Sequence, residues 1–263
     1  MNHIKKEKNP LNYLQSHEVT YFPIYNLLNN EDFNDKKILE VGSGLGYLTF
    51  ALKKSGYDVK GIDISKQAVE NSTKRFGDFF IVGDVTNYCK NHKNEYDLIV
   101  MNEVIEHLEN PKFFIRCLKS MLVSGGKLLI TTPNSSFNDN HSIWEGDLPP
   151  IHLWNFNKRS MEYIGDSLKL NLNFVNFKEY NSKYPVYKNN LIPIYESVLD
   201  RNGNTFYSLN YGCKLGSYLY ELYLKNNLIG TWLTKLFSSF INRKYCRYFG
   251  SESPCLGVIF EKY

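Results

Sequence analysis

Short apolar runs alternate with segments of helical periodicity through the first half of the chain. One helical segment ends at Gly56, a second runs from Ser65 to about Phe76, and a third begins at Pro111. Strands that alternate with helices favour a parallel sheet covered by helices on both faces. The pattern therefore predicts a doubly wound α/β fold with its ligand site at the carboxyl ends of the strands. The expected strands are 37–41, 59–64, 79–82, 98–101 and 127–131.

The second half continues less regularly. A helix is expected at 157–170, and strands at 173–180 and 255–263 complete a mostly parallel sheet of seven strands. The roughly 70 residues between these last two strands are too many for a structureless connection. We therefore expect three parts: an N-terminal helical cap over 1–35, a domain made of 36–181 and 255–263, and an inserted helical lid over 182–254.

An amphipathic helix is expected inside this lid, between Ile229 and Ile241, because apolar residues recur there at i, i+3, i+4 and i+7. Its apolar face is expected to pack on the sheet domain or on a second subunit. The alternative is peripheral contact with a membrane surface, assisted by the basic Arg243, Lys244 and Arg247.

Composition excludes several classes. The net charge of +4 is spread over scattered basic residues, so a nucleic-acid partner is not favoured. Five cysteines without a CxxC pair indicate neither a disulfide framework nor a zinc site. The first residues do not resemble a secretory signal, and no apolar stretch is long enough to span a membrane. A cytoplasmic location is therefore expected.

The segment ILEVGSGLGYLTF joins the first strand to a helix through a turn that contains Gly42, Gly44 and Gly46. Glycines allow such a turn to bend sharply and to approach a ligand closely. A dinucleotide-binding turn places its third glycine five positions after the first, where this chain has Tyr47. A nucleotide-like ligand is expected, and the loop departs from the NAD pattern.

Acidic residues follow the next two strands. Asp63 lies 21 positions after Gly42, and a carboxylate there can accept hydrogen bonds from both hydroxyls of a ribose. Gly83, Asp84 and Val85 follow the third strand. Taken singly, Asp63 also suits a helix cap and the Gly-Asp pair suits a simple turn. Their order after the glycine turn favours ligand binding.

These ordered motifs resemble those of the class I, Rossmann-like methyltransferases that use S-adenosylmethionine. The resemblance implies that the glycine turn wraps the methionine part, that Glu40 supports the turn, and that the third-strand motif meets adenine. It places Asn102, at the end of the fourth strand, beside the sulfonium. The donor-binding residues expected on this basis are Glu40, Gly42, Ser43, Gly44, Gly46, Asp63, Ile64, Asp84, Val85 and Asn102.

Two histidines are candidates for a general base, which methyl transfer needs only if the acceptor loses a proton. His107 follows the fourth strand and His152 follows the fifth, so both lie in loops at the carboxyl edge of the sheet. His107 also suits a structural role as a helix-start residue that is hydrogen-bonded to the backbone. His152 also suits a structural role as a packing residue. We rank His152 slightly ahead of His107.

A divalent metal is the less favoured alternative. Glu103, Glu106 and His107 resemble a cluster in ubiquinone-biosynthesis O-methyltransferases and small-RNA 2′-O-methyltransferases, where such residues help to bind an ion. His152 is then the most available fourth ligand. No second histidine flanks His152. A carboxylate-rich set such as Glu103, Glu106 and His107, which contains one histidine, defines a metal only loosely.

The sequence says least about the methyl acceptor. The segment PPIHLWNF resembles bacterial enzymes that methylate small metabolites, lipid-linked quinone precursors and surface-polysaccharide sugars. We expect methylation of a hydroxyl on such a small molecule, lipid-linked acceptors included. N-methylation of an amino sugar, a non-catalytic S-adenosylmethionine-binding protein and an NAD oxidoreductase remain the competing interpretations.

Overall fold

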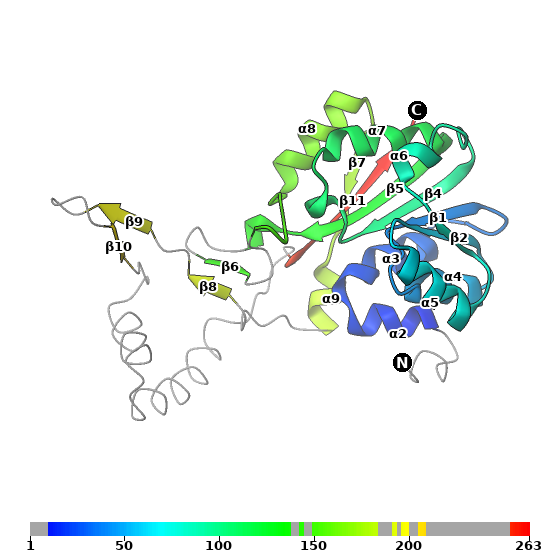
Figure 1. Cartoon of the computed structure of the whole chain (residues 1–263), viewed down its shortest axis with the longest axis horizontal. Helices are drawn as coiled ribbons and strands as arrows, with labels where there is room; N and C mark the ends of the chain where they lie inside the picture. The colour runs from blue at the N-terminus through cyan, green and yellow to red at the C-terminus, as the bar shows by residue number, and fades with distance from the viewer. Residues whose placement is uncertain are drawn as a thin grey trace.

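The computed structural model describes residues 10–137, 142–144, 149–183, 191–193, 196–199, 205–208 and 253–263. Within these ranges the chain forms a seven-stranded sheet in the order β3-β2-β1-β4-β5-β11-β7 (Figure 1). Strands β1 to β5 are parallel, whereas β11 is antiparallel to both of its neighbours. The predicted fold class is confirmed. The strands are β1 (Lys37–Val41), β2 (Asp58–Asp63), β3 (Phe80–Val82), β4 (Tyr96–Asn102), β5 (Leu122–Pro133), β7 (Asn171–Phe174) and β11 (Cys255–Glu261).

Both faces of this sheet are buried because alternate residues of each strand point to opposite sides. Ile38 and Leu98 belong to one apolar cluster, whereas Leu39 and Ile99 belong to the other. The first cluster includes residues of α2, α3 and α4, and the second includes residues of α7 and α8, which lie across the sheet from them in Figure 1. These helices are α2 (Pro10–His17), α3 (Phe22–Asn30), α4 (Tyr47–Lys54), α7 (Pro111–Met121) and α8 (Lys158–Leu168).

The N-terminal segment shares its core with the sheet. Its helices α2 and α3 are joined by a short 3-10 helix, η1 (Val19–Tyr21). Leu14 and Ile24 are buried against residues of α4 and of the central strands. This packing places η1 close to the functional edge of the sheet described below.

The strand order reverses between β1 and β4. The chain runs outward through β1, β2 and β3, and then returns to the other side of β1 with β4 and β5. Val41 pairs with Met101 in this register, so Gly42 and Asn102 leave the sheet side by side. Such a reversal is where doubly wound sheets bind ligands.

Several predicted boundaries are wrong. Strand β5 begins at Leu122, before the expected position 127. The predicted strand 173–180 ends at Phe174 and gives way to α9 (Lys178–Lys183). There the side chain of Asn176 accepts a hydrogen bond from the Lys178 amide over 2.9 Å and favours a helix start.

The described part of 182–254 is mostly β structure. It contains the end of α9 and three short strands, of which β9 and β10 pair antiparallel, while β8 pairs with β6. The amphipathic helix predicted between 229 and 241 lies outside the described residues. Across the ranges that are described, no helix is both long and apolar enough to cross a membrane. The strands are β6 (Ser142–Trp144), β8 (Leu191–Pro193), β9 (Glu196–Leu199) and β10 (Thr205–Ser208).

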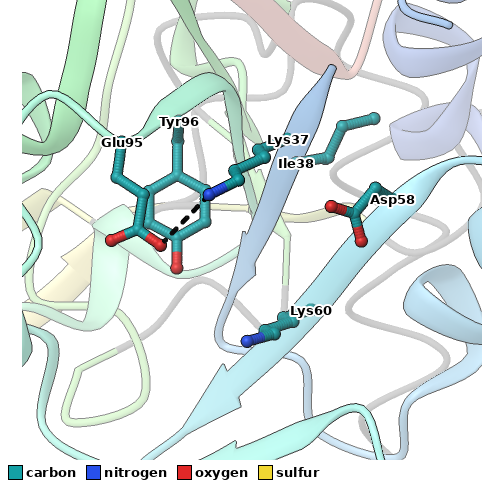
Figure 2. A pocket seen from close by; sticks show the side chains of 6 residues that line it. All are labelled: Lys37, Ile38, Asp58, Lys60, Glu95 and Tyr96. Carbon is teal, nitrogen blue, oxygen red and sulfur yellow. Dashed lines mark ion pairs between the residues drawn. The ribbon is translucent and has the colours of Figure 1, made fainter. Parts of the chain in front are cut away.

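The amino-terminal edge of the sheet carries a small cavity of about 50 Å³, shown in Figure 2. Lys37, Asp58 and Glu95 line it, and the Lys37 ammonium pairs with the Glu95 carboxylate over 3.8 Å. These charges of both signs are partly exposed to solvent. We therefore place the functional site at the opposite edge, where the strands end.

Candidate active site

The turn after β1 depends on three glycines in the left-handed region. Gly42, Gly44 and Gly46 have φ values of 74°, 49° and 75°. A Cβ atom at Gly42 would lie 2.5 Å from Val104 Cγ2, and one at Gly46 would lie 2.6 Å from ring atoms of Phe80. A Cβ at Gly44 would meet no described atom within 4 Å. Two glycines thus permit close packing, whereas the third leaves open space over the turn.

Asp63 links this turn to the end of β2. Its Oδ2 accepts a hydrogen bond from the Gly44 amide over 2.7 Å, and its Oδ1 accepts one from the Ser65 amide over 2.8 Å. Each carboxylate oxygen retains a second lone-pair direction for a ligand. The alternative role of helix cap falls to Ser65, whose side chain accepts from the Ala68 amide at the start of α5 (Lys66–Phe76).

Glu40 lies beneath the turn and is almost fully buried. One of its carboxyl oxygens accepts hydrogen bonds from the backbone amide of Thr49, over 2.8 Å, and from the Thr49 hydroxyl. Burial raises the pKa of Glu40 to about 8, although the hydrogen bonds from Thr49 oppose the rise. Glu40 therefore joins β1 to the first turn of α4.

A cavity of about 290 Å³ opens at this edge of the sheet. Its acidic wall is Asp63 and Asp84, and its apolar wall includes Val104, Leu108 and Phe114. Sequence reasoning did not identify these three apolar residues, whose only signal is their place after β4 and in the first turn of α7. The complete lining is Val41, Gly42, Ile62, Asp63, Ile64, Gly83, Asp84, Val85, Val104, His107, Leu108 and Phe114.

Asp84 contributes to this wall while capping the short helix α6 (Val85–Tyr88). Its Oδ1 accepts hydrogen bonds from the Thr86 amide and the Thr86 hydroxyl, both over 2.8 Å. These bonds fix the carboxylate at the rim. Val85, which follows it, is buried and lines the same cavity.

The chain bends sharply where β4 ends. Asn102 Oδ1 accepts a hydrogen bond from the Thr131 hydroxyl over 2.7 Å. Glu103 has a φ of 50°, in the left-handed region that few residues other than glycine adopt. This bend brings Val104 against Gly42 and leads directly into η2 (Ile105–His107).

Three of the four predicted metal-ligand candidates come together here. Ligand atoms of Glu106, His107 and His152 all lie within 4.8 Å of one another, and Glu103 is not in this group. The two imidazole rings meet edge to face, with centroids 4.7 Å apart. Glu106 is buried, and its Oε2 accepts a hydrogen bond from the Thr132 hydroxyl over 2.9 Å.

The second oxygen of Glu106 is available to a ligand. Within the described ranges, Oε1 is buried and has no hydrogen-bond partner. Burial raises the pKa of the Glu106 carboxyl, and the nearby imidazoles of His107 and His152 oppose that rise. A positive charge on a neighbouring imidazole would therefore stabilise the buried carboxylate of Glu106.

The loop that carries His152 is fixed to η2 by backbone hydrogen bonds. The Leu153 amide donates to the Glu106 carbonyl over 2.8 Å, and the Trp154 indole donates to the Leu108 carbonyl over 2.8 Å. His107 Nδ1 lies 2.6 Å from the Ile151 carbonyl oxygen. A carbonyl only accepts, so Nδ1 carries the proton and neutral His107 presents the lone pair of Nε2.

The residues around the turn fit S-adenosylmethionine. Asp63 lines the cavity with two oriented carboxylate oxygens that can accept from hydroxyl groups, and Val104, Leu108 and Phe114 form an apolar wall that suits a planar ring. The Ser43 hydroxyl is buried and finds no hydrogen-bond partner in the part of the chain that is described. The open space at Gly44 suits the polar amino-acid end of the ligand.

Comparisons with known proteins agree with this geometry. A family model described as a methyltransferase domain matches residues 14–178. The ubiquinone biosynthesis O-methyltransferase of Aliivibrio fischeri is 30% identical over 118 residues, which are 42% of this chain and 49% of the relative. That of Actinobacillus pleuropneumoniae is 31% identical over 108 residues, which are 38% and 46% of the two chains. The matched region thus spans about half the length of these relatives.

Solved structures show the same fold at low sequence identity. A SAM-dependent methyltransferase from Archaeoglobus fulgidus superposes with a TM-score of 0.52 at 13% identity, over 92% of this chain and 93% of that one. One from Methanosarcina mazei gives a TM-score of 0.50 at 13% identity, over 90% and 97% of the two chains. Since the family model covers more than half of the chain, this protein belongs to the class I, S-adenosylmethionine-dependent methyltransferases.

Proposed function

We propose that the protein transfers the methyl group of S-adenosylmethionine to a hydroxyl of a small molecule. The observation that carries this proposal is the position of His107, which lines the same cavity as Asp63 and Asp84. A donor whose ribose binds Asp63 then leaves the space around His107 for an acceptor. A base beside that space suits a hydroxyl, which must lose a proton when it is methylated.

The reaction needs alignment more than activation, because the sulfonium is already a good leaving group. The acceptor oxygen forms a bond to the methyl carbon while the carbon–sulfur bond breaks, which leaves neutral S-adenosylhomocysteine. The hydroxyl proton passes to Nε2 of His107, whose Nδ1–H is held by the Ile151 carbonyl. The buried carboxylate of Glu106 stabilises the imidazolium that forms.

We assign the base to His107 in preference to His152, which the sequence ranks first. His107 is part of the cavity lining, and its tautomer is set by a backbone carbonyl. His152 lies beside it, edge to face, with the two ring centroids 4.7 Å apart. In this proposal His152 positions the ring of His107.

A divalent cation is the alternative occupant of this cluster. The unpaired Oε1 of Glu106 and the approach of three ligand atoms to within 4.8 Å fit such an ion. Glu106, His107 and His152 would hold it, and a bound ion would lower the pKa of a nearby acceptor hydroxyl. Histidine and carboxylate ligands are shared by several first-row ions, so the metal is not specified further.

The acceptor class is proposed from the surface beside His107. Ile151, Leu153 and Trp154 are 57%, 46% and 47% exposed, and their loop is fixed to η2. Exposed apolar groups next to a base suit a planar phenolic, quinone-like acceptor, and the relatives named above are ubiquinone biosynthesis enzymes. A sugar hydroxyl, a lipid-linked acceptor and the amine of an amino sugar are further candidates.

The test is a transfer assay with radiolabelled S-adenosylmethionine and a panel of catechols, nucleotide-linked hexoses and amino sugars. We expect an O-methylated catechol, a rate about 100-fold lower for His107→Ala, and an unchanged rate for the remote His92→Ala control. Transfer only to an amine, or a wild-type rate in His107→Ala, would refute the assignment. Loss of activity after dialysis against a chelator, restored by one divalent ion, would select the metal alternative.

A further inference from the structure

Two consecutive threonines near the end of β5, Thr131 and Thr132, are fully buried. Adjacent residues of a strand point to opposite faces of the sheet, so their hydroxyls serve different sides. The Thr131 hydroxyl donates to Asn102 Oδ1 over 2.7 Å, in the neighbouring strand β4. The Thr132 hydroxyl donates to Glu106 Oε2 over 2.9 Å. Thr132 therefore contacts the cluster that holds the candidate base.

The position of Thr132 is fixed by the sheet, because β5 pairs with β4 on one side and with β11 on the other. Its β-branched side chain has few rotamers, so the hydroxyl is held in one direction. A little further along the chain, the Ser135 amide donates to the Phe156 carbonyl over 2.9 Å. The end of β5 thus supports Glu106 and also the loop that carries His152.

The carboxylate plane of Glu106 depends on this support. The backbone of Glu106 is held by two amides of the His152 loop, but the last torsion of a glutamate side chain is soft. Among the described residues, Oε1 has no hydrogen-bond partner, so the bond from Thr132 to Oε2 sets the plane. A carboxyl oxygen of Glu106 lies within 4.8 Å of ligand atoms of His107 and His152. The orientation of the carboxylate therefore decides how its charge meets the imidazoles.

A negative charge stabilises a developing positive charge best when it is already oriented, since no reorganisation is then needed during the reaction. We propose that Thr132 is a positioning residue for methyl transfer, whose hydroxyl orients the carboxylate of Glu106 toward His107. Thr132 is not among the residues that line the donor cavity, so it acts through Glu106 alone. The inference rests on the proposed function, in which His107 is the base.

Thr132→Val keeps the shape of the side chain and removes the hydroxyl. We expect it to lower the single-turnover rate of methyl transfer from S-adenosylmethionine to a catechol about tenfold, a usual loss when a supporting hydrogen bond is removed. Thr132→Ser keeps the hydroxyl and should retain most of the wild-type rate. Thr73→Val, at a half-buried threonine of α5, is the matched control. Calorimetry should give one dissociation constant for S-adenosylhomocysteine in all four chains.

A double variant shows whether Thr132 acts through Glu106. In Glu106→Gln the hydroxyl has no charge left to orient, so adding Thr132→Val should change the rate by less than about twofold. Two losses that multiply would give Thr132 an independent role and overturn the proposal.

The single variants can also overturn it. A Thr132→Ser chain as slow as Thr132→Val would assign the loss to packing, and a wild-type rate in Thr132→Val would remove the residue from the mechanism. Donor affinity that falls as far as the rate would make its role structural. If Thr132→Val fails to fold, Thr132→Ala removes the same hydroxyl and replaces it. A wild-type chain that methylates no hydroxyl acceptor would instead refute the proposed function, and this inference with it.

Discussion

The carboxylate of Asp63 accepts a hydrogen bond from the backbone amide of Gly44 over 2.7 Å. This bond joins the end of β2 to the glycine turn that follows β1. A second bond, from the Ser65 amide, fixes the other carboxylate oxygen. The acid is therefore oriented before any ligand arrives, and a preorganised acceptor loses little entropy on binding.

Asp63→Ala should weaken the binding of S-adenosylhomocysteine by on the order of 100-fold, because two ribose hydroxyls lose a charged acceptor. Calorimetry measures the change directly. Asp58→Ala is the matched control, since Asp58 begins the same strand at the opposite edge of the sheet. Equal affinity in Asp63→Ala and wild type would mean that the ribose binds elsewhere.

Substitutions at two glycines of the turn should change the stability of the protein and its affinity for the donor to different extents. Gly46→Ala places a methyl group 2.6 Å from the Phe80 ring, so we expect it to lower the free energy of unfolding by about 3 kcal/mol. Gly44→Ala meets no described atom within 4 Å, and its strain should cost only about 1 kcal/mol.

Gly44→Ala should be the more stable of the two variants and yet the weaker binder of the donor. Gly44→Ala fills the open space over the turn and should weaken S-adenosylhomocysteine at least tenfold, on the order of one lost close contact. Urea unfolding and calorimetry on the same samples measure both quantities. Full affinity in a well-folded Gly44→Ala would show that the donor does not approach this turn.

Much of the fold follows from local pattern. The glycine turn, Asp63 and the alternating strands specify the sheet because each depends on residues near in sequence. The start of β5 does not, since Leu122 is placed by its pairing with Tyr96 of β4, and the end of β7 depends on pairing with β11, more than 80 residues later in the chain. Sequence order alone therefore placed the middle of most strands better than their ends, and β7 is the exception because the predicted strand 173–180 runs into α9.

The site shows the same division. Asp63, Asp84 and His107 could be identified because each follows a strand at the carboxyl edge. The grouping of Glu106 with His152, without Glu103, depends on the left-handed bend at Glu103 and on how the loop docks on η2.

The buried Glu40 should make stability depend on pH. Burial raises its pKa from 4.5 to about 8, so the folded protein keeps a proton that the unfolded chain releases. Stabilisation is complete below pH 4.5 and declines until about pH 8, by at most about 1.4 kcal/mol per pH unit.

Glu40→Gln keeps the shape and the acceptor for Thr49 but cannot ionise, so its stability should vary less over this range. Urea unfolding at pH 5, 6.5 and 8 gives the comparison. Glu70→Gln, on the exposed side of α5, should leave the wild-type slope intact. A slope shared by wild type and Glu40→Gln would contradict the buried-proton account.

Glu106→Gln should slow methyl transfer about tenfold, because the imidazolium of His107 loses its buried negative partner. The affinity for S-adenosylhomocysteine should not change, since Glu106 does not line the donor cavity. Single-turnover rates on the acceptor identified by the transfer assay measure the effect. A loss of donor affinity as large as the loss of rate would move Glu106 into the donor site.

A structure of the complex with S-adenosylhomocysteine is the most direct test of the central claim, which is that one cavity joins the donor site at Asp63 to the base His107. We expect the ribose hydroxyls about 3 Å from the Asp63 carboxylate, the amino-acid end over Gly44, and the thioether sulfur directed toward the space beside His107. A ligand bound with its sulfur facing away from His107, or outside this cavity, would contradict the account.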